Sequence, residues 1–474
     1  MEFMHTCGIF KLKNNAKDQN KTSMTTVSPA LLTRRRVWAL AVPIILSNVS
    51  EPLVGYFDLL AAGHLETTIH ASAVTLSASA YLVMMWTFGF LRLSTGGFSA
   101  QAYGAEDAVQ LTAVYQRAAI IALILGGFCL LIQDPYFQLA EWIFAIREGS
   151  QQDLTREFFM VRVWGAPASL LLFVTFGWLV GLQEMRWIFV LQLALNLMNI
   201  ALNMLFTFEL GWGVAGIALA SNISTYVILA SSLVLVWRLG GLKKVANGRL
   251  FNPERFRALF SANADLMIRS LAIEGAFIYM LRMGNLRDEV FATANGIILR
   301  FHEIAAFGLD GFAMAVESLA GAAYGAGSVT AYRRALRLTT EAAIILALIW
   351  SAGFFIFGDQ IINSLTNKEP IRQAAQSLLL FGALSPLIGV LSYQLDGVFF
   401  GLTQTRILMV SMLFSALVFV GSSHFGLVPA FGMVGLWWGY VIFMFSRTST
   451  LLLALPYLDR QVQLRAEALR SAPQ

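Results

Sequence analysis

The chain has 474 residues, of which 57% are hydrophobic and only 13% are charged, and its mean hydropathy is +0.66. Apolar runs recur along nearly the whole length, which excludes an ordinary soluble enzyme and indicates a polytopic membrane protein. The net charge of +5 does not indicate nucleic-acid binding, because the basic residues gather in alternate loops and report membrane topology. The apolar runs are too long and too uniform for barrel strands, so we predict an all-α fold of about twelve transmembrane helices.

A polar tail precedes the first apolar run. Residues 1–33 carry four lysines before Met24 and no apolar stretch of the kind found in signal peptides. We therefore expect a disordered tail, and Met24 is a second candidate for the native start. The two cysteines, Cys7 in the tail and Cys129 in an apolar run, predict no disulfide.

The first predicted span, residues 34–65, holds residues that are costly in a membrane helix. Three arginines, Arg34 to Arg36, mark its cytoplasmic end. Pro43 lacks a backbone donor and gives the helix a place to bend. Asp58 is the leading functional residue, because a carboxylate at bilayer depth costs at least about 2.5 kcal/mol and usually faces a cavity, where it carries protons or ions. The alternative is a structural acid paired with a fixed donor. Glu51, seven residues earlier, lies on nearly the same face, about 10 Å away along the axis.

Eleven further spans follow in two groups. The first half continues at about 71–99, 112–132, 160–182, 186–208 and 212–237, and the second half runs at about 258–284, 290–321, 335–357, 375–402, 406–427 and 432–456. The acid-rich segment 134–157 is expected to be an external loop. We therefore predict an N-terminal six-helix bundle (34–238), a basic cytoplasmic linker (239–256), a C-terminal six-helix bundle (257–458) and a cytoplasmic C-terminal tail (459–474).

The two halves repeat each other at a separation of roughly 220 residues. The sequence AYGA at 102–105 returns at 323–326. Other matches pair Gly181, Leu182 and Arg186 with Gly401, Leu402 and Arg406, Gly213 and Gly216 with Gly432 and Gly435, and His64–Leu65 with Asn285–Leu286. Because the separation contains an even number of spans, the halves share one orientation, as in many secondary transporters. Asp58 falls opposite Tyr279, so the leading acid has no counterpart.

An amide stripe in the fifth span is the first candidate partner of Asp58. Asn196, Asn199 and Asn203 are spaced i, i+3 and i+7, which places them on one helical face. An amide donates to a carboxylate and accepts from a carboxylic acid, so the stripe suits either protonation state of Asp58. The alternative is that the amides only hold membrane helices together.

The second half has its own charged residues within apolar segments. Glu274, Asp310 and Asp396 are candidates for a second cation site, with structural ion pairing as the alternative. Glu317 shares a span with Asp310, and Arg92 in the second span is interpreted as a counter-charge. The sequence contains no ATP-binding loop, dinucleotide fingerprint or metalloprotease motif, so we predict neither an enzyme nor a metal or cofactor site.

The chain resembles the multidrug and toxic compound extrusion (MATE) family, and looks most like its DinF-like branch. The resemblance covers about residues 35–458. It is carried by Pro43, Asp58, FLRLSTGGFSAQAYGA at 90–105, Asn199, Asn203, LDGFAMAVE at 309–317 and LDGVFFG at 395–401. It implies two six-helix bundles and export of cationic or amphipathic compounds against inward H⁺ or Na⁺.

Carried over by position, the resemblance implies roles for individual residues. Asp58 would be the coupling acid, Pro43 the point where the first span bends, and Asn199 and Asn203 the hydrogen-bonding neighbours of the acid. Some relatives have an acid at the position of Asn203, which puts a two-carboxylate mechanism in doubt. Glu274 and Asp396 resemble acids linked to cation coupling in another branch, which keeps Na⁺ open.

These observations predict a monomeric H⁺-coupled multidrug antiporter of the bacterial inner membrane, with both termini in the cytoplasm. Its partners would be small cationic or amphipathic drugs and the lipid bilayer, and no nucleic acid. The nearest alternative is a lipid-linked sugar flippase of the same superfamily, which Arg92, Arg282 and Arg300 keep open. A second alternative is a membrane sensor that transports nothing, which would leave the internal repeat unexplained.

Overall fold

The computed structural model describes residues 29–63, 68–144, 146–285 and 289–471. Within these ranges the regular structure is entirely helical. The first half contains α1 (Arg34–Gly63), α2 (Thr68–Thr87), α3 (Phe90–Gly104), α4 (Ala108–Leu131), α5 (Gln133–Phe144), α6 (Ser150–Arg162), α7 (Ala166–Gly181), α8 (Met185–Met204) and α9 (Gly213–Arg238). The second half contains α11 (Pro253–Asn285), α12 (Glu289–Gly325), α13 (Val329–Leu365), α14 (Glu369–Gly401), α15 (Thr405–Ser422) and α16 (Val428–Ser471), and the short α10 (Asn247–Leu250) joins the halves.

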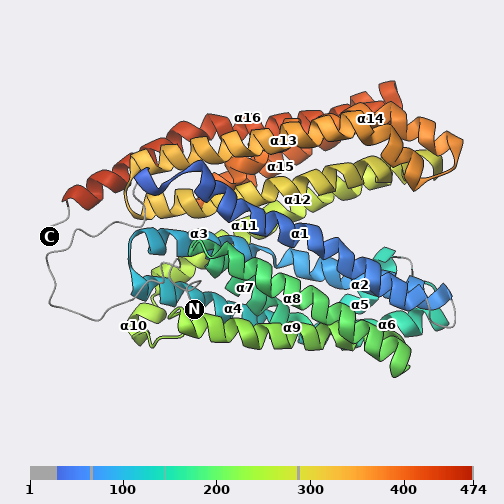
Figure 1. Ribbon diagram of the computed structural model, residues 1–474, viewed down its shortest axis with the longest axis horizontal. Coiled ribbons are helices and arrows are strands. Elements are labelled where there is room, and N and C mark those ends of the chain that lie inside the picture. Colours follow the sequence, from blue (N-terminus) through green and yellow to red (C-terminus); the bar gives the residue numbers. More distant parts are fainter. Residues whose placement is uncertain (1–28, 64–67, 145, 286–288, 472–474) are drawn as a thin grey trace.

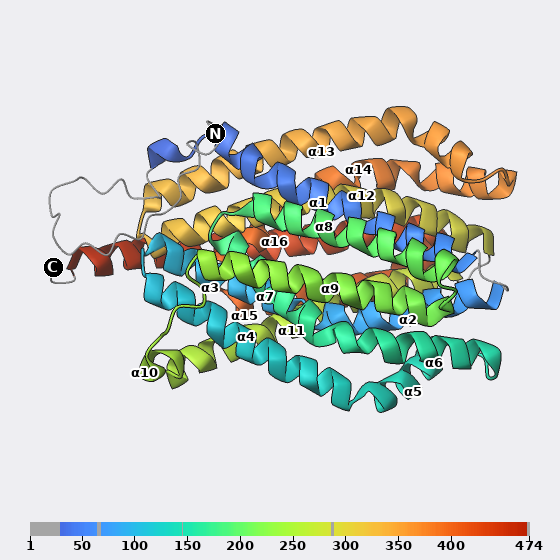
Figure 2. The ribbon, with the colours of Figure 1, turned by 60° about the horizontal axis from the view of Figure 1, so that its bottom comes forward.

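The two halves form two bundles that lie side by side (Figure 1). Helices α2 to α9 make one bundle and α11 to α16 make the other, and α1 runs along the boundary between them (Figure 2). Nine helical stretches of the described chain are long and apolar enough to cross a membrane, and the longest, Thr405–Ser471, contains both α15 and α16. With α1 and α11 this gives twelve passes, so the predicted all-α fold of two six-helix bundles is confirmed.

Several predicted spans are interrupted or longer than expected. The second span is two helices, α2 and α3, separated at Phe88 and Gly89, and the fourth is α6, a 3₁₀ turn and α7. The segment expected to be an external loop, 134–157, is instead mostly helical. Its helix α5 buries Phe137 and Ala140, and apolar residues at i and i+3 are enough to hold a short helix on a bundle.

The segment predicted as the C-terminal tail, 459–474, begins inside a helix. Residue 459 does not leave the helix, because α16 continues to Ser471. Leu458, Val462 and Ala466 recur every four residues and are buried, which is the spacing of one helical face. The polar residues between them lie toward the exposed side of the same helix and do not end it.

The internal repeat extends to the backbone. Gln183 and Thr403, 220 residues apart, both adopt positive φ (63° and 54°) at the ends of α7 and α14. Asp107 and Ser328 cap α4 and α13 by accepting from the backbone N–H three residues on. A π-helical turn ends α8 at 205–209 and follows α15 at 423–427. The predicted match of His64–Leu65 with Asn285–Leu286 cannot be followed in the backbone, because His64, Leu65 and Leu286 lie outside the described residues.

The repeated AYGA sequences meet at the boundary between the bundles, where α3 packs against α12. A Cβ atom added to Gly104 would lie 1.9 Å from the carbonyl oxygen of Ala322, and one added to Gly325 would lie 2.0 Å from that of Gln101. The two contacts are reciprocal, so the pseudo-symmetry axis passes between the ends of α3 and α12. Glycine is required at both positions because any side chain would force the backbones apart.

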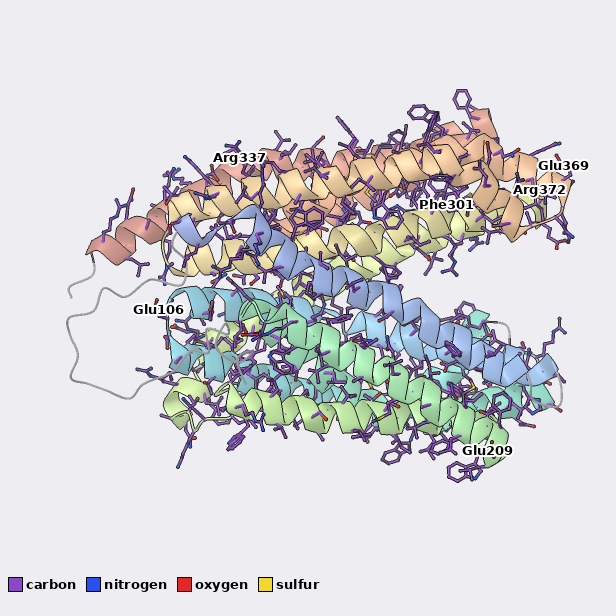
Figure 3. The ribbon with its side chains drawn as sticks, viewed as in Figure 1. Glu106, Glu209, Phe301, Arg337, Glu369 and Arg372 are labelled. Atoms are coloured by element: carbon purple, nitrogen blue, oxygen red, sulfur yellow. The ribbon has the colours of Figure 1, made fainter. Side chains whose placement is uncertain are left out.

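We call the end of the molecule with α10 and the last turns of α16 the linker end, and the opposite end the far end (Figure 1). Glu106 and Arg337 lie at the linker end, and Glu209, Glu369 and Arg372 lie at the far end (Figure 3). The predicted basic linker, 239–256, is attached to the first bundle. The buried Arg117 of α4 donates to the backbone carbonyls of Arg249 and Leu250.

Candidate functional site

Helix α1 connects the two bundles. Its first half packs on α12: the rings of Trp38 and Phe312 are 5.0 Å apart, and the Asn48 amide donates to the carbonyl of Phe307 at 3.2 Å. Its second half packs on α8 of the first bundle. Pro43 lies within the first half, so a change of angle at this proline would move the rest of α1 relative to the second bundle.

Asp58 lies on the second half of α1 and faces α8. Its Oδ1 accepts a hydrogen bond from the Asn203 amide, whose other side-chain atom, Oδ1, has no partner in the described structure. Arg162 of α6 is a positive charge that acts on Asp58. Its guanidinium lies 4.0 Å from the centre of the Tyr81 ring and donates to Asn222 at 2.8 Å. The acid thus has one direct amide donor and one cation held at a distance.

The three amides of the stripe have different partners. Asn203 bonds to Asp58, whereas the Asn199 amide donates to Ser221 Oγ of α9 at 2.8 Å, and the Asn196 amide donates to Ser50 Oγ of α1 at 2.9 Å. All three asparagines are buried. The stripe therefore joins α8 to α1 at two levels and to α9 at one, and only its last member contacts the acid. Glu51 is the other predicted partner residue of Asp58, and its side chain lies outside the described part of the structure.

Asp396 of α14 is bound by two arginines. Its Oδ2 accepts from Arg447 of α16 at 2.5 Å and also from Arg269 of α11. All three side chains are buried, and the guanidinium of Arg269 also lies 5.0 Å from the Phe400 ring centre. This carboxylate has one negative charge against the two positive charges of Arg269 and Arg447, so it has little capacity left for a further cation. The structural alternative is therefore favoured for this residue.

The other two candidates of the second site lie apart from this ion pair. Glu274 of α11 is half-buried, forms no ion pair in the described ranges, and its charge acts on Tyr136 of α5 in the opposite bundle. Asp310 of α12 is also half-buried, and the charges that act on it include those of Arg92 and Asp396. No group of three His, Cys, Asp or Glu side chains suited to a metal ion occurs in the described part of the chain.

The arginines that kept the flippase interpretation open mostly face outward. Arg300 is exposed and pairs with Glu303 at 2.6 Å, and Arg282 is exposed as well. Only Arg92 has a buried guanidinium nitrogen. The structure therefore does not gather these three residues into one cationic cavity.

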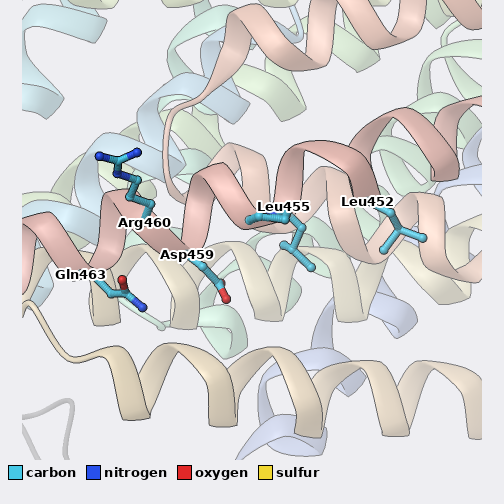
Figure 4. Close-up of a pocket in the computed structure, with 6 residues that line it drawn as sticks. Leu452, Leu455, Asp459, Arg460 and Gln463 are labelled. Carbon is cyan, nitrogen blue, oxygen red and sulfur yellow. The ribbon is translucent and has the colours of Figure 1, made fainter.

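A hollow of about 460 Å³ lies on α16 near the linker end (Figure 4). It contains none of the predicted site residues, and Asp459 in its wall is 3.7 Å from Arg333 of α13. The lining residues are Leu452, Leu455, Pro456, Asp459, Arg460 and Gln463. Its position away from Asp58 and from the boundary between the bundles separates it from the candidate site.

Sequence reasoning missed several members of the polar network. Ser221 and Arg162 were not singled out, because neither has a spacing that links it to Asp58. Arg269 and Arg447 were missed as well, although an arginine inside an apolar run was a usable signal. Arg447 is one such case, within FMFSRTSTLLL at 443–453.

Two bundles joined by α1, with an acid–amide pair in the first bundle, agree with the comparisons with known proteins. The MatE family model matches residues 43–205 and 273–421, including both Asp58 and Asp396. The chain belongs to the MatE family. MatE proteins are membrane transporters, not enzymes, so the predicted absence of catalytic chemistry agrees with the family.

The relatives and solved structures extend this likeness over nearly the whole chain. The DNA damage-inducible protein F of Escherichia coli (strain K12) is 32% identical over 87% of this chain and 90% of its own length, which confirms the resemblance to the DinF-like branch. The probable multidrug resistance protein NorM of Rhizobium meliloti (strain 1021) is 24% identical over 85% of this chain and 89% of its own. A solved MATE structure described as being in the bent conformation is 19% identical, with a TM-score of 0.82 over 94% of this chain and 99% of its own.

Proposed function

We propose that this transporter exports cationic or amphipathic drugs in exchange for H⁺, and that Asp58 carries the proton. The observation that supports this is the contact between Asp58 and Asn203 inside the first bundle. Acids inside membrane helices are rare, and they usually bind or transfer protons or ions. The relationship to proteins named for multidrug resistance supports drugs as the substrate class.

Protonation of Asp58 would change its contact with α8 without needing a new partner. The ionised carboxylate can only accept, and it accepts from the Asn203 amide. The neutral acid can donate, and the unpaired Oδ1 of Asn203 offers an acceptor. The exchange rotates the amide and shifts the part of α1 that follows Pro43, while the contact of Trp38 with Phe312 holds the first turns of α1 on α12. The bond from Asn48 to the Phe307 carbonyl would break in this shift. Pro43 is where α1 would bend to accommodate this shift.

Transport follows only if the drug binds the two states with different affinity. In our proposal the ionised Asp58 supports a pocket that accepts a cation, and protonation from outside removes the charge and closes the pocket. Exchange of one proton for one monovalent cation would be electroneutral. Na⁺ remains an alternative through Glu274 and Asp310, but the double pairing of Asp396 leaves Na⁺ without its third predicted ligand.

We further propose that the linker end faces the cytoplasm of a bacterial cell and that the transporter acts as a monomer in the inner membrane. The positive-inside rule supports this orientation. The exposed basic residues of the linker end include Lys243, Lys244, Arg333, Arg334, Arg337, Arg406, Arg460 and Arg470. The far end carries acids such as Glu209 and Glu369 (Figure 3).

The test is ethidium transport in energised inverted membrane vesicles, driven separately by a pH gradient and by a Na⁺ gradient. We expect the wild type to respond to the pH gradient, and Asp58→Asn to lose this response while it still folds and binds ethidium. Asp134→Asn is the matched control, because Asp134 is an exposed acid paired with Arg156 on the same bundle. Normal transport by Asp58→Asn would show that Asp58 is structural and would sink the proposal.

A further inference from the structure

Glu317 of α12 lies in the contact between the bundles. Its side chain is only 1% exposed, and its Oε1 lies directly against α3, 2.1 Å from the position of a Cβ added to Gly96. On the other side of α12, Gly401 of α14 packs on the backbone carbonyl of Glu317. The acid is thus enclosed by elements of both halves. Any separation of α3 from α12 would expose it.

Glu317 has no hydrogen bond to satisfy its charge. Its Oε1 is buried and finds no donor in the described parts of the chain, and Nη1 of Arg92, on α3, is buried and finds no acceptor there. Arg92 is also the charged group that acts on Glu317. The two form no ion pair within 4.0 Å, so an acid and a cation face the same interface without neutralising each other by contact.

Other charged groups near this interface are few. Helix α7 contains no charged residue, and the part of α1 that packs on α12, residues 37–50, contains none either. On α12 itself the next acid is Asp310, and beyond it lie Asp396 of α14, Arg269 of α11 and Arg447 of α16, which neutralise one another in part. Four charged residues of α13, Arg333, Arg334, Arg337 and Glu341, lie in its linker-end turns, and Asp359 lies in its far-end turns. Within the described part of the chain, no charged side chain therefore forms an ion pair with the Glu317 carboxylate, whose Oε1 has no hydrogen-bond partner there.

We propose that Glu317 is a second proton-binding site of this transporter, separate from Asp58. An ionised carboxylate that is buried without a hydrogen bond costs several kcal/mol, whereas the neutral acid does not carry that cost. The closed contact between α3 and α12 therefore binds a proton at Glu317. When the bundles separate at the linker end, the ionised carboxylate gains water, and the proton leaves to that side.

Asp310 provides a route by which a proton reaches Glu317 from the centre of the molecule. It precedes Glu317 by seven residues on α12, so the two acids share one helical face about 10 Å apart. Asp310 is half-buried, whereas Glu317 is almost fully enclosed. A proton that arrives from the far end would reach Asp310 first and Glu317 when the linker end is closed. This assigns Asp310, one of the predicted cation ligands, to proton transfer.

The inference rests on the proposed function and changes its stoichiometry. Two protons entering through Asp58 and Glu317 for one monovalent cation leaving would move one net charge per cycle. Exchange would then be accelerated by an interior-negative membrane potential. With Asp58 alone the exchange would be electroneutral and would not respond to the potential.

The experiment uses the purified full chain in proteoliposomes, with ethidium as the monovalent cation and a potassium diffusion potential imposed with valinomycin. We expect the wild type to exchange two protons per ethidium and to be accelerated by the potential. Glu317→Gln, which keeps the size of the side chain, should exchange one proton per ethidium and ignore the potential. Glu303→Gln is the matched control, because Glu303 lies on the same helix but is exposed and paired with Arg300, and it should behave as the wild type does.

The outcomes separate this inference from the proposed function. Proton-driven transport by the wild type with an unchanged voltage response in Glu317→Gln would overturn the second site and leave Asp58 as the coupling acid. No proton-driven transport by the wild type would overturn both. If Glu317→Gln fails to fold, the wild-type ratio decides, because one proton per ethidium in the wild type contradicts a second site.

Discussion

The two bundles share one backbone plan, but they differ at the position of the leading acid. In the first bundle Asp58 of α1 bonds to Asn203 of α8. The equivalent helices of the second bundle, α11 and α15, meet through the rings of Tyr279 and Phe419, whose centres are 5.6 Å apart. At this position the contact is therefore polar and titratable in one half and aromatic in the other, while elsewhere along α11 and α15 Thr405 donates to Asp265 at 2.9 Å.

The second bundle does contain a buried acid, but that acid is compensated. Asp396 bonds to Arg269 and Arg447, both buried. This fixed ion pair stabilises one arrangement of α11, α14 and α16. The stabilisation is lost if Asp396 gains a proton. In the described structure the direct partner of Asp58 is an amide, so its charge can change at lower cost. The comparison indicates that the first bundle changes its protonation at Asp58 while the core of the second stays rigid.

The largest predicted effect comes from opening the ion pair of the second bundle. Asp396→Asn should leave the buried guanidinium groups of Arg269 and Arg447 without their counter-charge. It should lower the free energy of unfolding by about 3–5 kcal/mol, because removing one partner of a buried ion pair leaves the other uncompensated. Thermal unfolding in detergent measures this loss. Arg300→Met removes a cation from an exposed pair and should cost less than about 1 kcal/mol. Equal losses in the two variants would show that the buried network does not stabilise the bundle.

A second prediction compares Asn203 of α8 with Ser423, the equivalent residue in the π-helical turn that follows α15. Asn203→Ala removes the hydrogen bond to Asp58, worth about 1.5–3 kcal/mol when one partner is charged, and should slow proton-driven ethidium transport at least about tenfold. Ser423 is the corresponding residue of the second bundle, and its hydroxyl makes no hydrogen bond within the described ranges. Ser423→Ala should transport as the wild type does. A similar loss in both variants would remove the distinction between the bundles.

The smallest effect is expected where the bundles are alike. Gly104→Ala and Gly325→Ala each place a methyl group about 2 Å from a backbone carbonyl of the other bundle. Both should lower the free energy of unfolding by about 1–3 kcal/mol, as overpacking does, and by similar amounts because the contacts are reciprocal. Gly127→Ala is the control, since nothing lies within 4 Å of its Cβ position. A large difference between the first two variants would contradict the symmetry of this contact.

Much of the fold could be predicted because it depends on local patterns. Apolar runs determine the membrane spans, and the glycines repeated every 220 residues are needed for the close contacts of α3 with α12 and α7, and of α12 with α14. The break at Phe88 and Gly89 and the helical continuation of α16 beyond Leu458 depend on packing against other helices. Hydropathy alone does not contain that information.

The candidate site was predictable to the extent that spacing defined it. The interval from Asn196 to Asn203 placed the amides on one face, and the last of them contacts Asp58. The partner of Asn199, Ser221 of α9, could not be predicted, because a serine in an apolar helix has many other hydrogen-bonding options. The pairing of Asp396 with Arg269 and Arg447 joins residues 127 and 51 positions apart, so no local pattern reveals it.

The central claim is that Asp58 releases a proton when a cationic drug binds. The most direct measurement is the number of protons released when ethidium is added to the purified transporter in weakly buffered detergent solution. The account predicts that Asp58→Asn binds ethidium but releases about one proton fewer than the wild type, as expected when one titrating carboxyl is lost. An unchanged proton release in Asp58→Asn, at equal ethidium binding, would contradict it.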